Sequence, residues 1–172
     1  LRGKTQGVLS TDRFALNTRD QYRLNGRAYV FGQNQYVRDT FKNIDYLLAP
    51  TAGLGYSVLG TMASKLDVDL GAGGVWEKNP GADVRSSGAI TAGEKLVQTL
   101  TGTTTLTQSV NALWKTDDFG DSLVNTSIGV AMAVSSRTQF KIGLQDSYKN
   151  KPPNATIKKN DLATILALVF KL

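Results

Sequence analysis

Residues 65–78 read KLDVDLGAGGVWEK, and this stretch decides the fold. Apolar side chains occupy alternate positions: Leu66, Val68, Leu70, Ala72 and Trp76. Charged side chains occupy positions between them: Lys65, Asp67, Asp69 and Glu77. Because side chains in a strand alternate between faces with a period of two, the pattern predicts a strand with one apolar and one charged face.

The same alternation recurs to the end of the chain, where Leu166, Leu168, Phe170 and Leu172 are in phase. A soluble sandwich strand can show this pattern too. A last strand that ends on an aromatic residue and a leucine favours a closed barrel. We therefore predict a single all-β domain over residues 1–172: an antiparallel transmembrane β-barrel of the bacterial outer membrane, with about ten strands (range 8–12).

Composition excludes several classes of protein. No run of 18 or more apolar residues exists, which excludes a transmembrane helix but not a barrel, since a barrel strand has apolar residues only at every second position. There is no cysteine and no histidine. This removes disulfides, thiolate metal sites, the usual general base and the commonest metal ligand. We therefore expect no enzyme activity, no cofactor and no metal.

The net charge of +6 raises the question of nucleic-acid binding. Lys and Arg are scattered through the strands and loops instead of forming a stripe, so we expect no nucleic-acid partner. No signal peptide opens the chain, so we interpret the sequence as that of an exported protein in a mature or trimmed form. The expected location is the outer membrane, with both termini in the periplasm.

Turn residues divide the chain into strands. We predict strands at residues 4–16, 46–59, 65–78, 84–98, 103–115, 123–134, 138–149 and 162–172. A turn is expected at residues 17–20, and residues 21–39 run on without a turn signal. Pro50 cannot donate to a ladder, so a bulge is expected there.

Loop lengths and aromatic residues both predict two different ends of the barrel. Long connections at residues 78–83, 116–121 and 150–160 alternate with short ones at 60–64, 99–102 and 135–137, as expected for external loops and periplasmic turns. Aromatic side chains near the strand ends are expected to form two girdles at the membrane interfaces. The outer girdle comprises Tyr46, Trp76, Trp114 and Tyr148, and the inner girdle comprises Tyr56, Phe140 and Phe170.

Residues 30–56, VFGQNQYVRDTFKNIDYLLAPTAGLGY, carry a recognisable signature. Its parts are an aromatic–Gly strand, an Arg-Asp-x-Phe-x-x-Ile-Asp-Tyr loop at 38–46 and a Gly-Leu-Gly-Tyr strand end at 53–56. Together with the Tyr-Lys-Asn-Lys-Pro-Pro segment at 148–153, they resemble the salt-induced outer-membrane protein family, the YdiY-like group, which is catalogued as a domain of unknown function. The resemblance covers residues 21–172. It implies an outer-membrane barrel and no established activity.

One departure from that family concerns residues 21–39, where its members have two strands joined by a short turn. We therefore expect a turn or a chain gap near Tyr29 and Val30. An even strand count also requires it, because a closed antiparallel barrel needs its last strand, residues 162–172, beside its first.

The carboxylates of Asp67 and Asp69 are expected to face the lumen. Paired carboxylates can perform acid–base chemistry, but lumen charges more often form cross-strand salt bridges. The candidate partners are Arg85, Lys95 and Lys141. Asp117, Asp118 and Asp121 do not match a calcium-loop spacing, and Gly71, Gly73 and Gly74 lack the helix of a dinucleotide site.

Two function classes remain open. The first is a narrow pore or transport channel for ions or small solutes. The second is a structural or interaction barrel of the envelope, with a plugged lumen and a protein partner. The membrane lipid, phospholipid and lipopolysaccharide, is a partner in both. Lysines of the last long loop, Lys149, Lys151, Lys158 and Lys159, are candidates to meet lipopolysaccharide phosphates.

Overall fold

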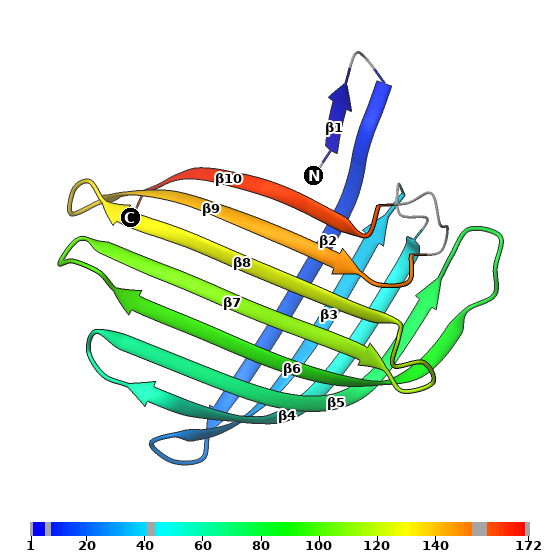
Figure 1. The fold of residues 1–172 in the computed structure, drawn as a ribbon, viewed down its shortest axis with the longest axis horizontal. Coiled ribbons are helices and arrows are strands. Elements are labelled where there is room, and N and C mark those ends of the chain that lie inside the picture. Colours follow the sequence, from blue (N-terminus) through cyan, green and yellow to red (C-terminus); the bar gives the residue numbers. More distant parts are fainter. Residues whose placement is uncertain (1, 6–7, 41–43, 153–157, 171–172) are drawn as a thin grey trace.

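The computed structural model describes the backbone of residues 2–5, 8–40, 44–152 and 158–170, and the side chains of this part from residue 14 onward. Ten strands make up the described chain (Figure 1). They are β1 Arg2–Thr5, β2 Val8–Arg23, β3 Ala28–Asp39, β4 Ile44–Gly60, β5 Ser64–Lys78, β6 Arg85–Thr99, β7 Thr104–Lys115, β8 Ser122–Ala133, β9 Thr138–Lys149 and β10 Asn160–Phe170.

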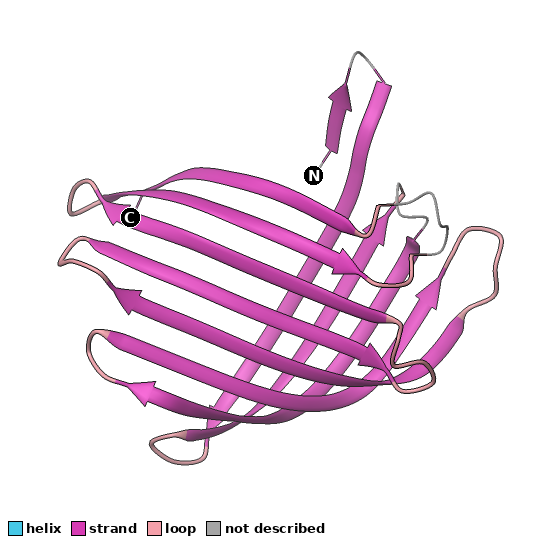
Figure 2. Cartoon of the chain, viewed as in Figure 1, coloured by secondary structure: helices cyan, strands magenta, loops and turns pink. Residues whose placement is uncertain are grey.

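Each strand pairs antiparallel with the next one along the chain, so the sheet order is β1 to β10. The described residues contain strands, loops and turns and no helix (Figure 2). Within the described residues, no helix is long and apolar enough to cross a membrane. The all-β, antiparallel prediction is confirmed, and the sheet curls into a half-barrel (Figure 1).

The described residues do not close this sheet into a ring. β10 pairs with β9, β2 pairs with β1 and β3, and no register joins β10 to β1 or β2 in the described part. The predicted pairing of residues 162–172 with the first strand is therefore wrong as far as Phe170; Leu172 lies outside the described residues. The short β1 pairs with β2 only at its Val8 end, so most of the outer edge of β2 has no partner strand in the described part.

A turn at residues 24–27 divides the segment that showed no turn signal. Asn25 Oδ1 accepts hydrogen bonds from the backbone N–H groups of Arg27 and Ala28, both at 2.8 Å, which closes the turn. The predicted turn within residues 21–39 is thus confirmed, but its predicted position is wrong, because Tyr29 and Val30 lie inside β3. Asn25-Gly26 was the overlooked turn signal. The turn predicted at residues 17–20 is wrong, because these residues pair continuously with β3.

Pro50 does not create a bulge. Its residue partner on β3 is Asn34 in an unbroken register, while pairing with β5 stops after Leu48 and resumes at Thr51 without a shift. The missing N–H of proline therefore removes ladder bonds on one side only. The irregularity between β4 and β5 lies between Ser57 and Leu59.

Connections of different length lie at opposite ends of the sheet (Figure 1). Residues 79–84, 116–121 and the connection after Lys149 form what we call the long-loop end. Residues 24–27, 61–63, 100–103 and 134–137 form the short-turn end. In the 79–84 loop, Gly81 has a φ of 74°, which a residue without a Cβ adopts most easily.

The two faces of the sheet differ in chemistry. On the convex face Leu54 and Leu70 are 64% and 67% exposed, and they are register partners. Apolar exposed residues continue along this face to Leu166 and Phe170 of β10. Glu94 and Asp146 interrupt it, each opposite an apolar residue of a neighbouring strand. A curled sheet with this exposed apolar surface is unlike a water-soluble half-buried sheet, whose apolar face is covered.

The concave face carries the buried core. Val37, Leu47, Val75, Ala89 and Leu113 are each at most 6% exposed and lie toward the long-loop end. Further along the same face, bulky residues of β3 pack over glycines of β4 and β5: a Cβ added to Gly55 would lie 2.1 Å from Cζ of Tyr29, and one added to Gly71 would lie 2.9 Å from Cζ of Phe31. Small residues on this face therefore let the sheet curl tightly around large ones.

Candidate functional site on the concave face

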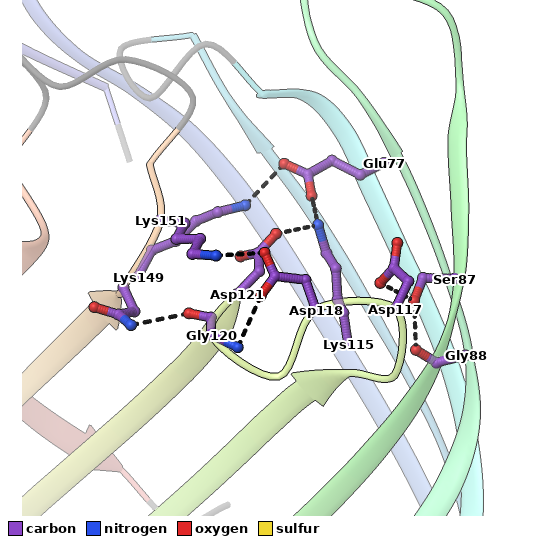
Figure 3. Close-up of polar contacts among 11 residues, drawn as sticks. Glu77, Ser87, Gly88, Lys115, Asp117, Asp118, Gly120, Asp121, Lys149 and Lys151 are labelled. Carbon is purple, nitrogen blue, oxygen red and sulfur yellow. Dashed lines mark hydrogen bonds and ion pairs between the residues drawn. The ribbon is translucent and has the colours of Figure 1, made fainter.

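Three strands bring charged side chains together at the long-loop end. Glu77 Oε2 accepts a hydrogen bond from Lys115 Nζ at 2.5 Å, and Glu77 Oε1 accepts one from Lys149 Nζ at 2.8 Å (Figure 3). Lys115 Nζ also donates to Asp121 Oδ2 at 2.6 Å. We call these four residues, Glu77, Lys115, Asp121 and Lys149, the charged cluster.

Strand direction and alternation explain why they meet. β5, β7 and β9 run in the same direction, so their last residues lie at the same end of the sheet. Glu77, Lys115 and Lys149 are each at or next to the last residue of their strand. Because these strands are not neighbours, their side chains can touch only on the inside of the curl. The contacts therefore identify the face of Glu77 as the concave one.

Burial makes these ion pairs strong local constraints. The side chains of Glu77 and Lys149 are 5% and 6% exposed, and that of Lys115 is 13% exposed. A buried charge is tolerated only when it is paired and hydrogen-bonded. Each carboxylate oxygen of Glu77 has its own ammonium partner, so the cluster cross-links β5, β7 and β9.

The 116–121 loop adds further polar contacts beside the charged cluster (Figure 3). Asp118 accepts hydrogen bonds from the Gly120 N–H at 3.0 Å and from Lys151 Nζ at 2.5 Å. The Lys151 hydrogen bond holds the pKa of Asp118 below its ordinary value. Asp117 accepts a 2.5 Å hydrogen bond from Ser87 Oγ, and this bond likewise lowers the pKa of Asp117.

A second polar group lies further along the concave face. Arg19 donates to Asp69 Oδ2 at 2.8 Å and to Gln33 Oε1 at 3.0 Å. Its guanidinium also stacks on Phe31, 4.0 Å from the ring centroid. Ion pair and cation–π contact together hold this arginine against the sheet.

All five charged residues predicted to line the lumen lie on the same face as Glu77. The alternation and register of β5 and β6 place Asp67, Asp69, Arg85 and Lys95 on this face. The register from β6 through β7 and β8 to β9 places Lys141 there too. Of the predicted partners, Lys95 is the register partner of Asp67, but the polar contacts of the two carboxylates go to other residues. Asp69 pairs with Arg19, Asp67 accepts a 2.5 Å hydrogen bond from Ser57, and no ion pair joins either to Arg85, Lys95 or Lys141 in the part described.

The predicted aromatic residues all lie on the convex face, at the two ends of the strands. Tyr46, Trp76, Trp114 and Tyr148 lie toward the long-loop end. Tyr56, Phe140 and Phe170 lie toward the short-turn end.

Sequence reasoning missed the charged cluster. Lys149 was expected in an exposed loop, but it is buried against Glu77. The sequence did contain a usable signal. Each of the three strand residues of the charged cluster, Glu77, Lys115 and Lys149, is the last inward-facing position of its strand before a long loop. Among the described residues, no group of three carboxylates could hold a metal ion.

A curled antiparallel sheet with an apolar convex face and a charged concave face defines the β-barrel-like class. Within this class the chain belongs to the family described as "Protein of unknown function, DUF481", whose model matches residues 1–172. It is 21% identical over 165 residues to the uncharacterized protein YdiY of Escherichia coli K12. That match covers 95% of this chain and 63% of YdiY, so the chain spans less than two thirds of this relative. The predicted resemblance to a YdiY-like family is confirmed.

Proposed function

We propose that the protein is an integral β-barrel of the outer membrane and a narrow pore for ions or small solutes. The observation that carries this proposal is the division of the sheet into an apolar convex face and a charged concave face. Exposed Leu70 and paired Asp69 are adjacent in sequence and lie on opposite faces. A barrel strand in lipid needs this arrangement, with the polar side chains toward the lumen.

In this proposal the long-loop end is external and the short-turn end is periplasmic. The chain reaches the short-turn end at Phe170. Lys158 and Lys159 are exposed, and they are the proposed contacts for lipopolysaccharide phosphates. The edges of β2 and β10 must also be paired in the bilayer, because an unpaired backbone group in lipid costs several kcal/mol.

The charged cluster is the proposed constriction of the pore. A ring of charged side chains selects ions by sign, and here one buried carboxylate lies between two ammonium groups. We propose transport and not catalysis, since the charges of the cluster are neutralised by one another.

Conductance across a planar lipid bilayer tests the proposal. Lys149→Met leaves the charge of Glu77 less compensated and should shift selectivity toward cations, whereas Glu77→Gln should shift it toward anions. Lys78→Met is the matched control, because Lys78 is next to Glu77 but pairs with Tyr46 on the convex face. Absence of channels from correctly inserted protein would contradict the pore.

A second candidate function rests on how well the concave face is filled. Tyr29 and Phe31 are each 3% exposed, and the charged cluster spans five strands. A barrel plugged in this way would act as a structural or interaction protein of the envelope. It would insert into membranes, give no conductance and be recovered with an envelope protein partner.

A further inference from the structure

A cavity opens beside the charged cluster at the long-loop end. It has a volume of about 240 Å³ and lies between the ends of β5 and β6, the 116–121 loop and the end of β9. Since a water molecule occupies about 30 Å³ in the liquid, the cavity has room for a small organic solute.

The charges around this cavity are balanced. Among the described residues, four cationic and four anionic side chains line it. Most of them are paired with one another: Lys115 and Lys149 with Glu77, and Lys151 with Asp118. A ligand with a large net charge of either sign would be repelled by half of the lining, and an apolar ligand would leave all of it unsolvated.

Three groups at the cavity retain binding capacity. The guanidinium of Arg85 has no ion-pair or hydrogen-bond partner among the described residues. Asp117 has the Ser87 hydroxyl as its side-chain partner but forms no ion pair there. The buried Oδ1 of Asn79 has no hydrogen-bond partner in the same part of the chain. The cavity lining thus contributes a guanidinium and two acceptors with unused hydrogen-bonding capacity.

We propose that this cavity binds a small zwitterionic solute that carries both a carboxylate and an ammonium group, such as a free amino acid or a dipeptide. The carboxylate pairs with the fork of Arg85, which suits it geometrically. The ammonium donates to Asp117 and to Asn79 Oδ1. The inference rests on the proposed pore and names the class of solute that first binds at its outer mouth.

Calorimetric titration of the detergent-solubilised protein with glycylglycine tests the site. We expect saturable binding, with acetate alone and methylammonium alone binding at least about tenfold more weakly. Arg85→Gln and Asp117→Asn should each lower the affinity for glycylglycine about tenfold, as expected for the loss of one charge-assisted hydrogen bond. Both side chains are exposed, so neither change should disturb folding.

Matched controls are Asp83→Asn, an exposed carboxylate of the 79–84 loop that does not line the cavity, and Arg137→Gln, in a turn at the other end of the sheet. Both should bind glycylglycine like the unmodified protein. Equal binding of acetate and glycylglycine, unchanged affinity in Arg85→Gln, or no saturable binding would each overturn the inference. If the unmodified protein conducts ions but does not bind glycylglycine, the proposed binding site is refuted and the pore is not. If it binds glycylglycine but does not conduct ions, the pore is refuted and the binding site is not.

Discussion

Glu77 and Lys149 are 72 residues apart in the chain, yet Lys149 Nζ donates to Glu77 Oε1 at 2.8 Å from the other side of three intervening strands. This ion pair shows that the sheet is strongly curved, because β5 and β9 can approach each other only if the sheet curls between them. It also places two buried charges at the long-loop end of the concave face.

Breaking this pair should be costly. In Lys149→Met the carboxylate of Glu77 loses one of its two ammonium partners while it stays buried, and we expect a loss of roughly 3 kcal/mol in the free energy of unfolding. Urea unfolding in lipid vesicles measures it. Lys151→Met is the control, because the Lys151–Asp118 pair is about half exposed and should contribute less than about 1 kcal/mol. Equal losses in the two variants would show that burial of the cluster does not matter.

Gly53 should not tolerate a side chain. A Cβ at this position would lie 2.1 Å from the backbone oxygen of Leu70, so Gly53→Ala must push two paired strands apart and should destabilise the protein by about 1–3 kcal/mol. Gly32→Ala is the control, because a Cβ there meets nothing within 4 Å. The midpoint of unfolding should fall in the first variant and not in the second. Similar midpoints would contradict the close approach of β4 and β5.

The two faces should respond differently to a new charge in a bilayer. Leu70→Lys places an ammonium on the convex face and should cost about 2–4 kcal/mol if this position is near the midplane. Gln145→Lys places the same group on the concave face, where Gln145 is exposed and pairs with Ser127, and should cost much less. Unfolding from vesicles compares them. A larger loss in Gln145→Lys would reverse the assignment of faces.

The 116–121 loop should loosen in acid. Because the pKa of Asp118 is lowered in the folded protein, its stabilising contribution is complete above the unfolded-state pKa of about 4 and is lost as the pH falls through the lower folded value. Limited proteolysis by an acid-active protease, or NMR shifts of the loop, should report this change. Asp118→Asn should weaken the pH dependence and leave the part that comes from Asp117, whereas Asp83→Asn should retain it in full. A loop that loosens already near pH 6 would point to another group.

Much of the fold could be predicted from local patterns. The alternation in residues 65–78 assigned Asp67 and Asp69 to one face and Leu70 to the other, and the register of β5 and β6 agrees. This works because the side-chain period of a strand is two whatever the sheet does around it. The turn at 79–84 and the alternation of long and short connections could be predicted for a similar reason, since turn residues determine the backbone conformation only of the few residues around them.

Tertiary structure alone decided the partners. Arg19 was assigned to a turn, yet it lies within β2 and pairs with Asp69, 50 residues away. Lys149 looked like a loop lysine and is buried against Glu77. Which charges meet depends on how tightly ten strands curl, and that curvature arises from glycines and bulky residues of different strands packing against each other. The period-two pattern of a strand determines on which face a side chain lies. Which residues it contacts there depends on how closely non-neighbouring strands approach each other, and only the tertiary structure determines that.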